Sequence, residues 1–154
     1  MAARVDVPDA GPRGRGLSPW MRDASRAFAE ALFWTDEGPP PAERLDWLVE
    51  DLDDFLARSG ARARLTYLLC LVAIAVVAPL ATWKLPPLQH LSAPDRMAAV
   101  ERAERGLLGL AVFGAKAILC VLYYEHTDAG RAAGFDGSCL HEPAAEQLPP
   151  EARA

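Results

Sequence analysis

Few side chains in this sequence could perform acid–base or metal chemistry, and the densest group lies near the C-terminus. Cys139, His141 and Glu142 are close neighbours there, whereas His90 and His126 stand alone. A zinc site needs three or four ligands at recurring spacings, and no second pair of ligands at a three- or four-residue step accompanies this group. We therefore predict that the chain holds no metal.

A run of carboxylates is the other candidate for chemistry. Glu50, Asp51, Asp53 and Asp54 occur within five positions. Catalytic carboxylates sit in a concave and partly desolvated cleft, but these alternate with leucines in a pattern that predicts the outer face of an amphipathic helix. Solvated surface charge explains them. No glycine-rich phosphate loop follows a strand either, so we predict no catalytic residue and no cofactor bound by this chain.

The three cysteines do not form a disulfide framework, because their number is odd and their spacing irregular. Cys70 and Cys120 lie inside apolar runs, where a thiol behaves as a small hydrophobic side chain. Cys139 lies in a polar, glycine-containing stretch. A free thiol and a bridge to another chain are the two interpretations of Cys139.

Composition and charge restrict the class of protein. The chain has 154 residues, a formal net charge of −5 and a pI near 5.2, so nothing indicates a nucleic-acid partner. The N-terminal residues carry charges, proline and glycine without an apolar core, which argues against a signal peptide. We expect a protein of the cytoplasm or of the cytoplasmic face of the membrane. We predict a disordered arm over 1–16, one helical domain over 17–141 and a disordered tail over 142–154.

Apolar residues recur at three- and four-residue steps, which predicts an all-α bundle. Ser18 before Pro19 starts the first helix, and Ser92 with Asp95 forms a capping box at the fourth. Gly60 and Gly106 mark breaks. The expected bundle has about five helices, over residues 18–34, 42–59, 65–83, 92–105 and 107–124.

Two of these segments, 65–83 and 107–124, are apolar on nearly every side and are expected to be the central helices. The first contains no charged residue and approaches the length that crosses a bilayer, although Pro79 should end or kink it. Lys116 would be costly at the centre of a membrane. We favour a bundle core for both segments. The alternative is a small integral membrane protein with a span at about 65–83.

Three short motifs in the second half occur in a recognisable order. Leu91 to Arg96 (LSAPDR) opens a charged helix, Val121 to Tyr124 (VLYY) ends an apolar one, and Gly134 to Gly137 (GFDG) forms a turn. In this order they resemble the small helical subunit of the gluconate 2-dehydrogenase subunit 3 type. They are similar also to the N-terminal helical module of long-chain alcohol oxidases in the glucose–methanol–choline flavoprotein family.

The resemblance implies a non-catalytic accessory subunit that stabilises or positions a flavoprotein oxidoreductase, with FAD bound by the large subunit. Apart from the resemblance, the apolar segment Leu65 to Trp83 offers a candidate membrane contact. Two features depart from the family, namely the missing export signal and the strongly apolar 65–83 segment. The alternative for the two tyrosines is that they merely cap a core helix. By the resemblance, the residues expected at the partner contact are Tyr123, Tyr124, Gly134, Phe135, Asp136 and Gly137.

Overall fold

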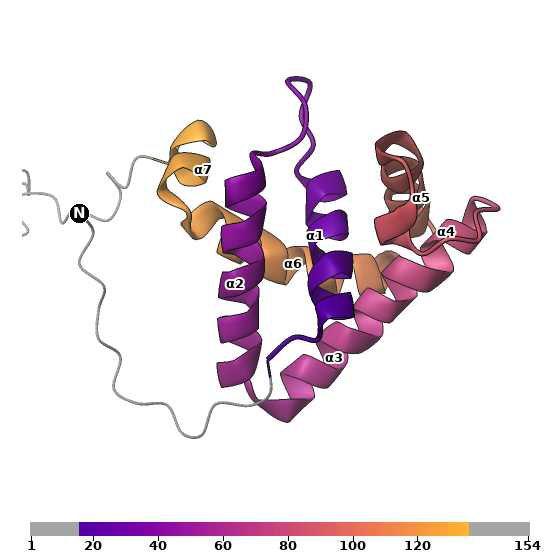
Figure 1. The fold of residues 1–154 in the computed structure, drawn as a ribbon, viewed down its shortest axis with the longest axis horizontal. Coiled ribbons are helices and arrows are strands. Elements are labelled where there is room, and N and C mark those ends of the chain that lie inside the picture. Colours follow the sequence, from indigo (N-terminus) through magenta and orange to yellow (C-terminus); the bar gives the residue numbers. More distant parts are fainter. Residues whose placement is uncertain (1–15, 136–154) are drawn as a thin grey trace, which may run out of the picture.

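A computed structural model describes residues 16–135 of the chain, and within that range it contains helices and no strand. The prediction of an all-α bundle is confirmed. Helices α1 (Pro19–Leu32) and α2 (Ala42–Arg58) stand side by side, and the apolar helices cross beneath and behind them (Figure 1). The predicted disordered arm, apart from Gly16, and the predicted tail lie outside the described residues.

Helix α1 forms as predicted from its first residues. The Ser18 hydroxyl accepts a hydrogen bond from the Met21 amide at 3.3 Å, and Pro19 occupies the first helical position. Met21, Ala24 and Phe28 are buried along one side. The helix ends at Leu32, two residues before the predicted Trp34, and a tight turn follows in which Thr35 pairs with Gly38.

Helix α2 carries the clearest amphipathic pattern in the chain. Leu45, Leu48 and Leu52 are at most 2 % exposed, and the intervening acidic residues face outward. The helix ends at Arg58, and Gly60 then adopts φ 83°, a left-handed conformation that glycine takes without a Cβ clash. The predicted stop at Gly60 is confirmed.

The third predicted helix is longer than expected. Helices α3 (Gly60–Val72), η1 (Ala73–Val77) and α4 (Ala78–Ala81) follow one another without a break, and we call them together the α3–α4 helix. Of the two outcomes predicted at Pro79, an end or a kink, the first does not occur, because the helix continues to Ala81. A π-helical turn at η1 precedes the proline, with the Ala78 amide bonded five residues back to Ala73. This wider turn accommodates a ring that would clash with the preceding turn of a regular α-helix.

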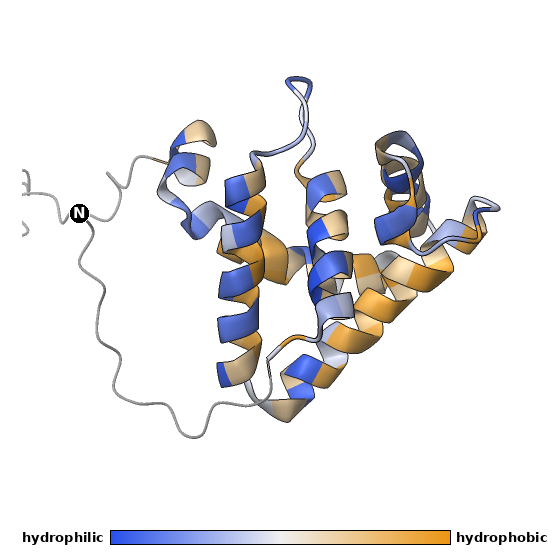
Figure 2. Ribbon diagram, viewed as in Figure 1, coloured by the Kyte–Doolittle hydropathy of each residue, from blue (hydrophilic) through white to orange (hydrophobic). Residues whose placement is uncertain are grey.

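The α3–α4 helix is also long and apolar enough to cross a membrane, by length and composition alone. One third of its most apolar window is buried inside the protein. Figure 2 shows hydrophobic residues along this helix beyond its first turns, whereas α1 and α2 combine hydrophilic and hydrophobic sides. Helices α5 and α6 pass the same test only when joined, and they are bent by 115° to each other.

The second half of the chain packs on this frame. A short 3-10 helix, η2 (Leu88–His90), leads into α5 (Ala93–Arg105). The Ser92 hydroxyl accepts a hydrogen bond from the Asp95 amide, as the predicted capping box requires. Helix α6 (Gly109–Glu125) contacts α2, α3 and α5. A short helix that the sequence did not predict, α7 (Thr127–Ala132), closes the described part.

Candidate functional site

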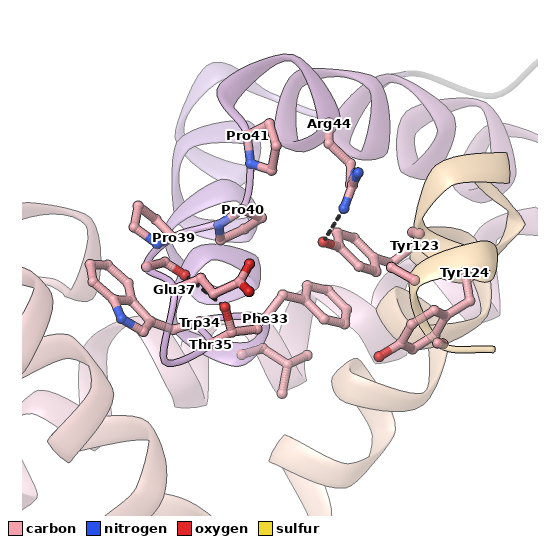
Figure 3. A pocket seen from close by; sticks show the side chains of 15 residues that line it. Phe33, Trp34, Thr35, Glu37, Pro39, Pro40, Pro41, Arg44, Tyr123 and Tyr124 are labelled. Atoms are coloured by element: carbon pink, nitrogen blue, oxygen red, sulfur yellow. Dashed lines mark hydrogen bonds between the residues drawn. The ribbon is translucent and has the colours of Figure 1, made fainter.

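The two tyrosines predicted at a partner contact line an open groove of about 660 Å³ (Figure 3). Its walls come from residues between 32 and 41, from the first turn of α2, from the end of α6 and from α7. We call it the aromatic groove. Its main side chains are Phe33, Trp34, Glu37, Pro39, Pro40, Pro41, Arg44, Tyr123 and Tyr124.

Stacked aromatic rings form the floor of the aromatic groove. The rings of Phe33 and Tyr123 lie face to face, with centroids 3.8 Å apart and planes 9° from parallel. Tyr124 stands edge-on to both, at 6.1 Å from Phe33 and 5.4 Å from Tyr123. Tyr123 is 6 % exposed and Tyr124 is 48 % exposed. One tyrosine is therefore structural, and the other is presented to solvent.

Arg44 is the cationic group of the aromatic groove. Its Nη1 donates a hydrogen bond to the Tyr123 hydroxyl at 3.2 Å, and its guanidinium carbon lies 5.6 Å from the Tyr123 ring centroid. Its Nε is buried and has no hydrogen-bond partner in the described part of the chain. Nor does Arg44 form an ion pair with any described carboxylate. A buried donor of this kind is destabilising until an acceptor reaches it.

Of the four other residues predicted at the partner contact, the structure describes Gly134 and Phe135. Gly134 adopts φ 85°, as a glycine turn requires, and the Phe135 amide bonds to the Gly130 carbonyl at 2.9 Å. The Phe135 ring is half exposed beside α7, one wall of the groove. Asp136 and Gly137 lie outside the described residues.

Sequence reasoning missed Phe33, Arg44 and the three prolines as parts of this site. Arg44 lies 79 residues before Tyr123 and the others lie further from it, so no spacing rule connects them. The run Pro39 to Pro41 before a helix was the one local signal, because prolines there present a rigid wall.

The carboxylate run on α2 has a structural use. Asp53 binds both the Arg22 guanidinium and the Leu17 amide, and so ties the start of α1 to α2. Asp54 pairs with Arg58 one turn later at 3.0 Å. Together with Arg22 and Trp47, the four carboxylates line an open pocket of about 330 Å³, in which Asp53 and Asp54 have counter-charges.

Other candidates for chemistry are dispersed over the fold. Within residues 16–135 no group of three His, Cys, Asp or Glu side chains is arranged to hold a metal ion. His90 is exposed, and the His126 ring stands edge-on to Trp47 with centroids 5.0 Å apart. Burial raises the pKa of the Cys120 thiol, which favours the protonated form and lowers its reactivity. Cys139, His141 and Glu142 lie outside the described residues.

Comparisons of the chain with protein-family models, with curated proteins and with solved structures find no match.

Proposed function

We propose that this chain is a non-catalytic accessory subunit that binds a flavin-dependent oxidoreductase of the glucose–methanol–choline type through the aromatic groove. The partner class rests on the resemblance of residues 91–138 to known small subunits. The binding mode rests on the groove. In this proposal FAD belongs to the large subunit, and the small subunit stabilises or positions it at the cytoplasmic face of the membrane.

One observation carries the proposal, namely the buried Arg44 Nε that has no acceptor inside the described chain. A guanidinium forms its strongest contacts with carboxylates, often through two parallel hydrogen bonds. Arg44 as a whole is only partly buried, so a partner segment that brings an Asp or Glu into the aromatic groove would pair with the accessible part of this guanidinium and offset the cost of the buried Nε. Its aliphatic part would lie against the edge of Tyr124 and the proline wall.

The composition of the groove suits a protein partner. Tyrosine and arginine are enriched in the residues that dominate binding energy, particularly where a ring is partly buried and its rim is polar. Tyr124 is held edge-on by two other rings, so little side-chain freedom remains to be lost on binding. The groove is thus organised before a partner arrives.

The test is co-expression with a flavoprotein of this type encoded beside the gene. We expect a stable yellow complex on size-exclusion chromatography, with the flavin absorbance eluting together with the small subunit. Arg44→Met should weaken the complex about tenfold or more, because the partner's carboxylate would lose its counter-ion. Arg102→Met, on the exposed side of α5, is the matched control and should leave binding unchanged.

Two results would overturn the proposal. A small subunit that elutes apart from the flavoprotein at micromolar concentration would exclude the complex. A complex that tolerates Arg44→Met as well as it tolerates Arg102→Met would exclude the aromatic groove as its interface.

A further inference from the structure

The α3–α4 helix buries one of its two apolar sides and exposes the other. Tyr67, Leu71 and Ile74 are at most 1 % exposed against the bundle. On the outer side an apolar stripe recurs at three- and four-residue steps and is 39–62 % exposed, comprising Leu65, Leu69, Val72, Val76 and Leu80. Monomeric soluble proteins rarely leave a stripe of this length uncovered.

Helix α6 repeats this arrangement. Val112, Ala115 and Leu119 are fully buried, whereas Leu110 and Phe113 on the outer side are 83 % and 68 % exposed. The two helices pack against each other. We call the exposed sides of the α3–α4 helix and of α6 the apolar face.

Charge distinguishes the apolar face from the rest of this acidic protein. Residues 55–94 and 106–124, which contain both helices, include no Asp or Glu, although the chain as a whole has 21. The two ends of the α3–α4 helix differ in charge. Arg62, which is exposed, and Arg64 lie in its first turns and form the cationic flank of the apolar face, whereas Lys84 after its end is paired with Asp95 at 3.3 Å. An apolar surface with a cationic flank is complementary to a lipid surface of negative charge.

Trp83 is an unusual residue at the end of this helix. It is 95 % exposed and adopts φ 59°, an outlier for a bulky residue, which places the indole in solvent. Tryptophan is enriched where hydrocarbon meets water in membranes, because its ring is apolar and its N–H is polar. Leu85, two residues later, is 88 % exposed.

From these observations we propose that the apolar face binds the surface of a bilayer containing anionic lipids. The side chains of the stripe enter the boundary between headgroups and acyl chains, and Trp83 anchors one end. This binding surface is separate from the aromatic groove. It extends the membrane placement named in the proposed function and is tested without the flavoprotein.

The binding is interfacial rather than transmembrane. Ser25 on α1 and Tyr67 on α3 share a buried hydrogen bond of 2.9 Å between their hydroxyl groups. A span would have to withdraw Tyr67 and its buried neighbours from the bundle and leave these hydroxyl groups unpaired. Lying on the surface requires no such change. A protein interface is the weaker alternative, because the stripe is aliphatic and offers no hydrogen-bonding group for a polar partner surface.

The test uses the full chain and vesicle flotation. The chain should float with vesicles of phosphatidylcholine and phosphatidylglycerol, and bind pure phosphatidylcholine vesicles about tenfold more weakly, because the cationic flank at Arg62 and Arg64 loses its counter-charge. Leu69→Glu should reduce binding about tenfold or more. Phe55→Glu replaces a residue that is 39 % exposed on α2, outside the apolar face, and should leave binding unchanged.

Trp83→Gly separates a fold defect from a binding defect. Glycine adopts this positive φ freely, so the variant should melt at the same or a higher temperature, yet bind vesicles several-fold more weakly. Circular dichroism should report unchanged helix content for each variant. Each variant should also retain binding to the flavoprotein, whereas Arg44→Met should retain binding to vesicles.

Several results would overturn this inference. The chain could remain with the soluble fraction for both kinds of vesicle. It could stay in cell membranes after an alkaline carbonate wash, which would show a span. It could also form a dimer that Leu69→Glu dissociates while vesicle binding is absent, which would assign the apolar face to a second copy of this chain.

Discussion

The aromatic groove and the apolar face are suited to bind their partners through different interactions. The groove offers a directional donor, the Arg44 guanidinium, beside rings whose orientation is held by stacking. The apolar face offers area without direction, since its outward side chains carry almost no polar atom. A directional site selects one partner geometry, whereas an area of aliphatic side chains partitions into any apolar phase. The two surfaces therefore suit different occupants, a protein segment and a bilayer.

The largest expected effect separates the buried and exposed sides of the α3–α4 helix. Leu71→Ala should lower the free energy of unfolding by about 2–5 kcal/mol, because it opens a cavity beside a fully buried residue. Leu69→Ala, two positions earlier and 62 % exposed, should change it by less than about 0.5 kcal/mol. Urea titration followed by circular dichroism measures both. Equal losses would show that the outer stripe is already covered in solution.

The buried hydrogen bond between Ser25 and Tyr67 should have the next largest effect. Tyr67→Phe leaves the Ser25 hydroxyl unpaired and should lower the free energy of unfolding by about 1–2 kcal/mol. The double variant Ser25→Ala, Tyr67→Phe should lose less than the sum of the single variants. Additive losses in urea titration would mean that the two hydroxyl groups are not coupled.

The same pair should make the free energy of unfolding fall in alkaline solution. Burial raises the pKa of the Tyr67 hydroxyl above its usual value, since the ionised form is desolvated. A raised pKa contributes stability that is complete below the unfolded value of about 10 and declines as the pH rises above it. Tyr67→Phe should therefore reduce the decline in stability above about pH 10. An identical pH profile for the variant and the natural chain would contradict this.

Trp83, which follows the α3–α4 helix, should have a smaller effect on the free energy of unfolding. Trp83→Gly should raise the free energy of unfolding by up to about 1 kcal/mol, because the left-handed backbone no longer carries a Cβ, although glycine adds freedom to the unfolded chain. Vesicle binding should fall in the same variant. Thermal unfolding is the measurement, and a clear loss of stability would mean that the indole packs against the protein.

The smallest effect on folding is expected in the aromatic groove. Arg44→Met removes a buried nitrogen without an acceptor together with one hydrogen bond to Tyr123, so the two contributions should nearly cancel. The free energy of unfolding should change by less than about 0.5 kcal/mol, while partner binding is lost. A large loss in urea titration would identify Arg44 as a structural residue.

Local chemistry made much of the fold predictable. Ser18 and Ser92 are side-chain caps, Gly60 and Gly106 are breaks, and the leucines of α2 repeat on one side, so these elements lie within two residues of their predicted bounds. The start of the third helix was not predictable in this way, because Gly60 indicates a stop and here also begins the next helix, five residues before Leu65. Nor does Pro79 end this helix, since the π-helical turn at η1 makes room for the proline ring.

The sequence by itself determined that the chain is helical, where most helices begin and end, and that two of them are apolar. It determined this because capping and periodicity act between residues within a few positions of one another. Only the tertiary structure decided which side of each apolar helix is buried, since both sides carry similar side chains and periodicity cannot distinguish them. The tertiary structure also brought Phe33 and Arg44 to Tyr123, because contacts between such distant residues depend on how the helices pack.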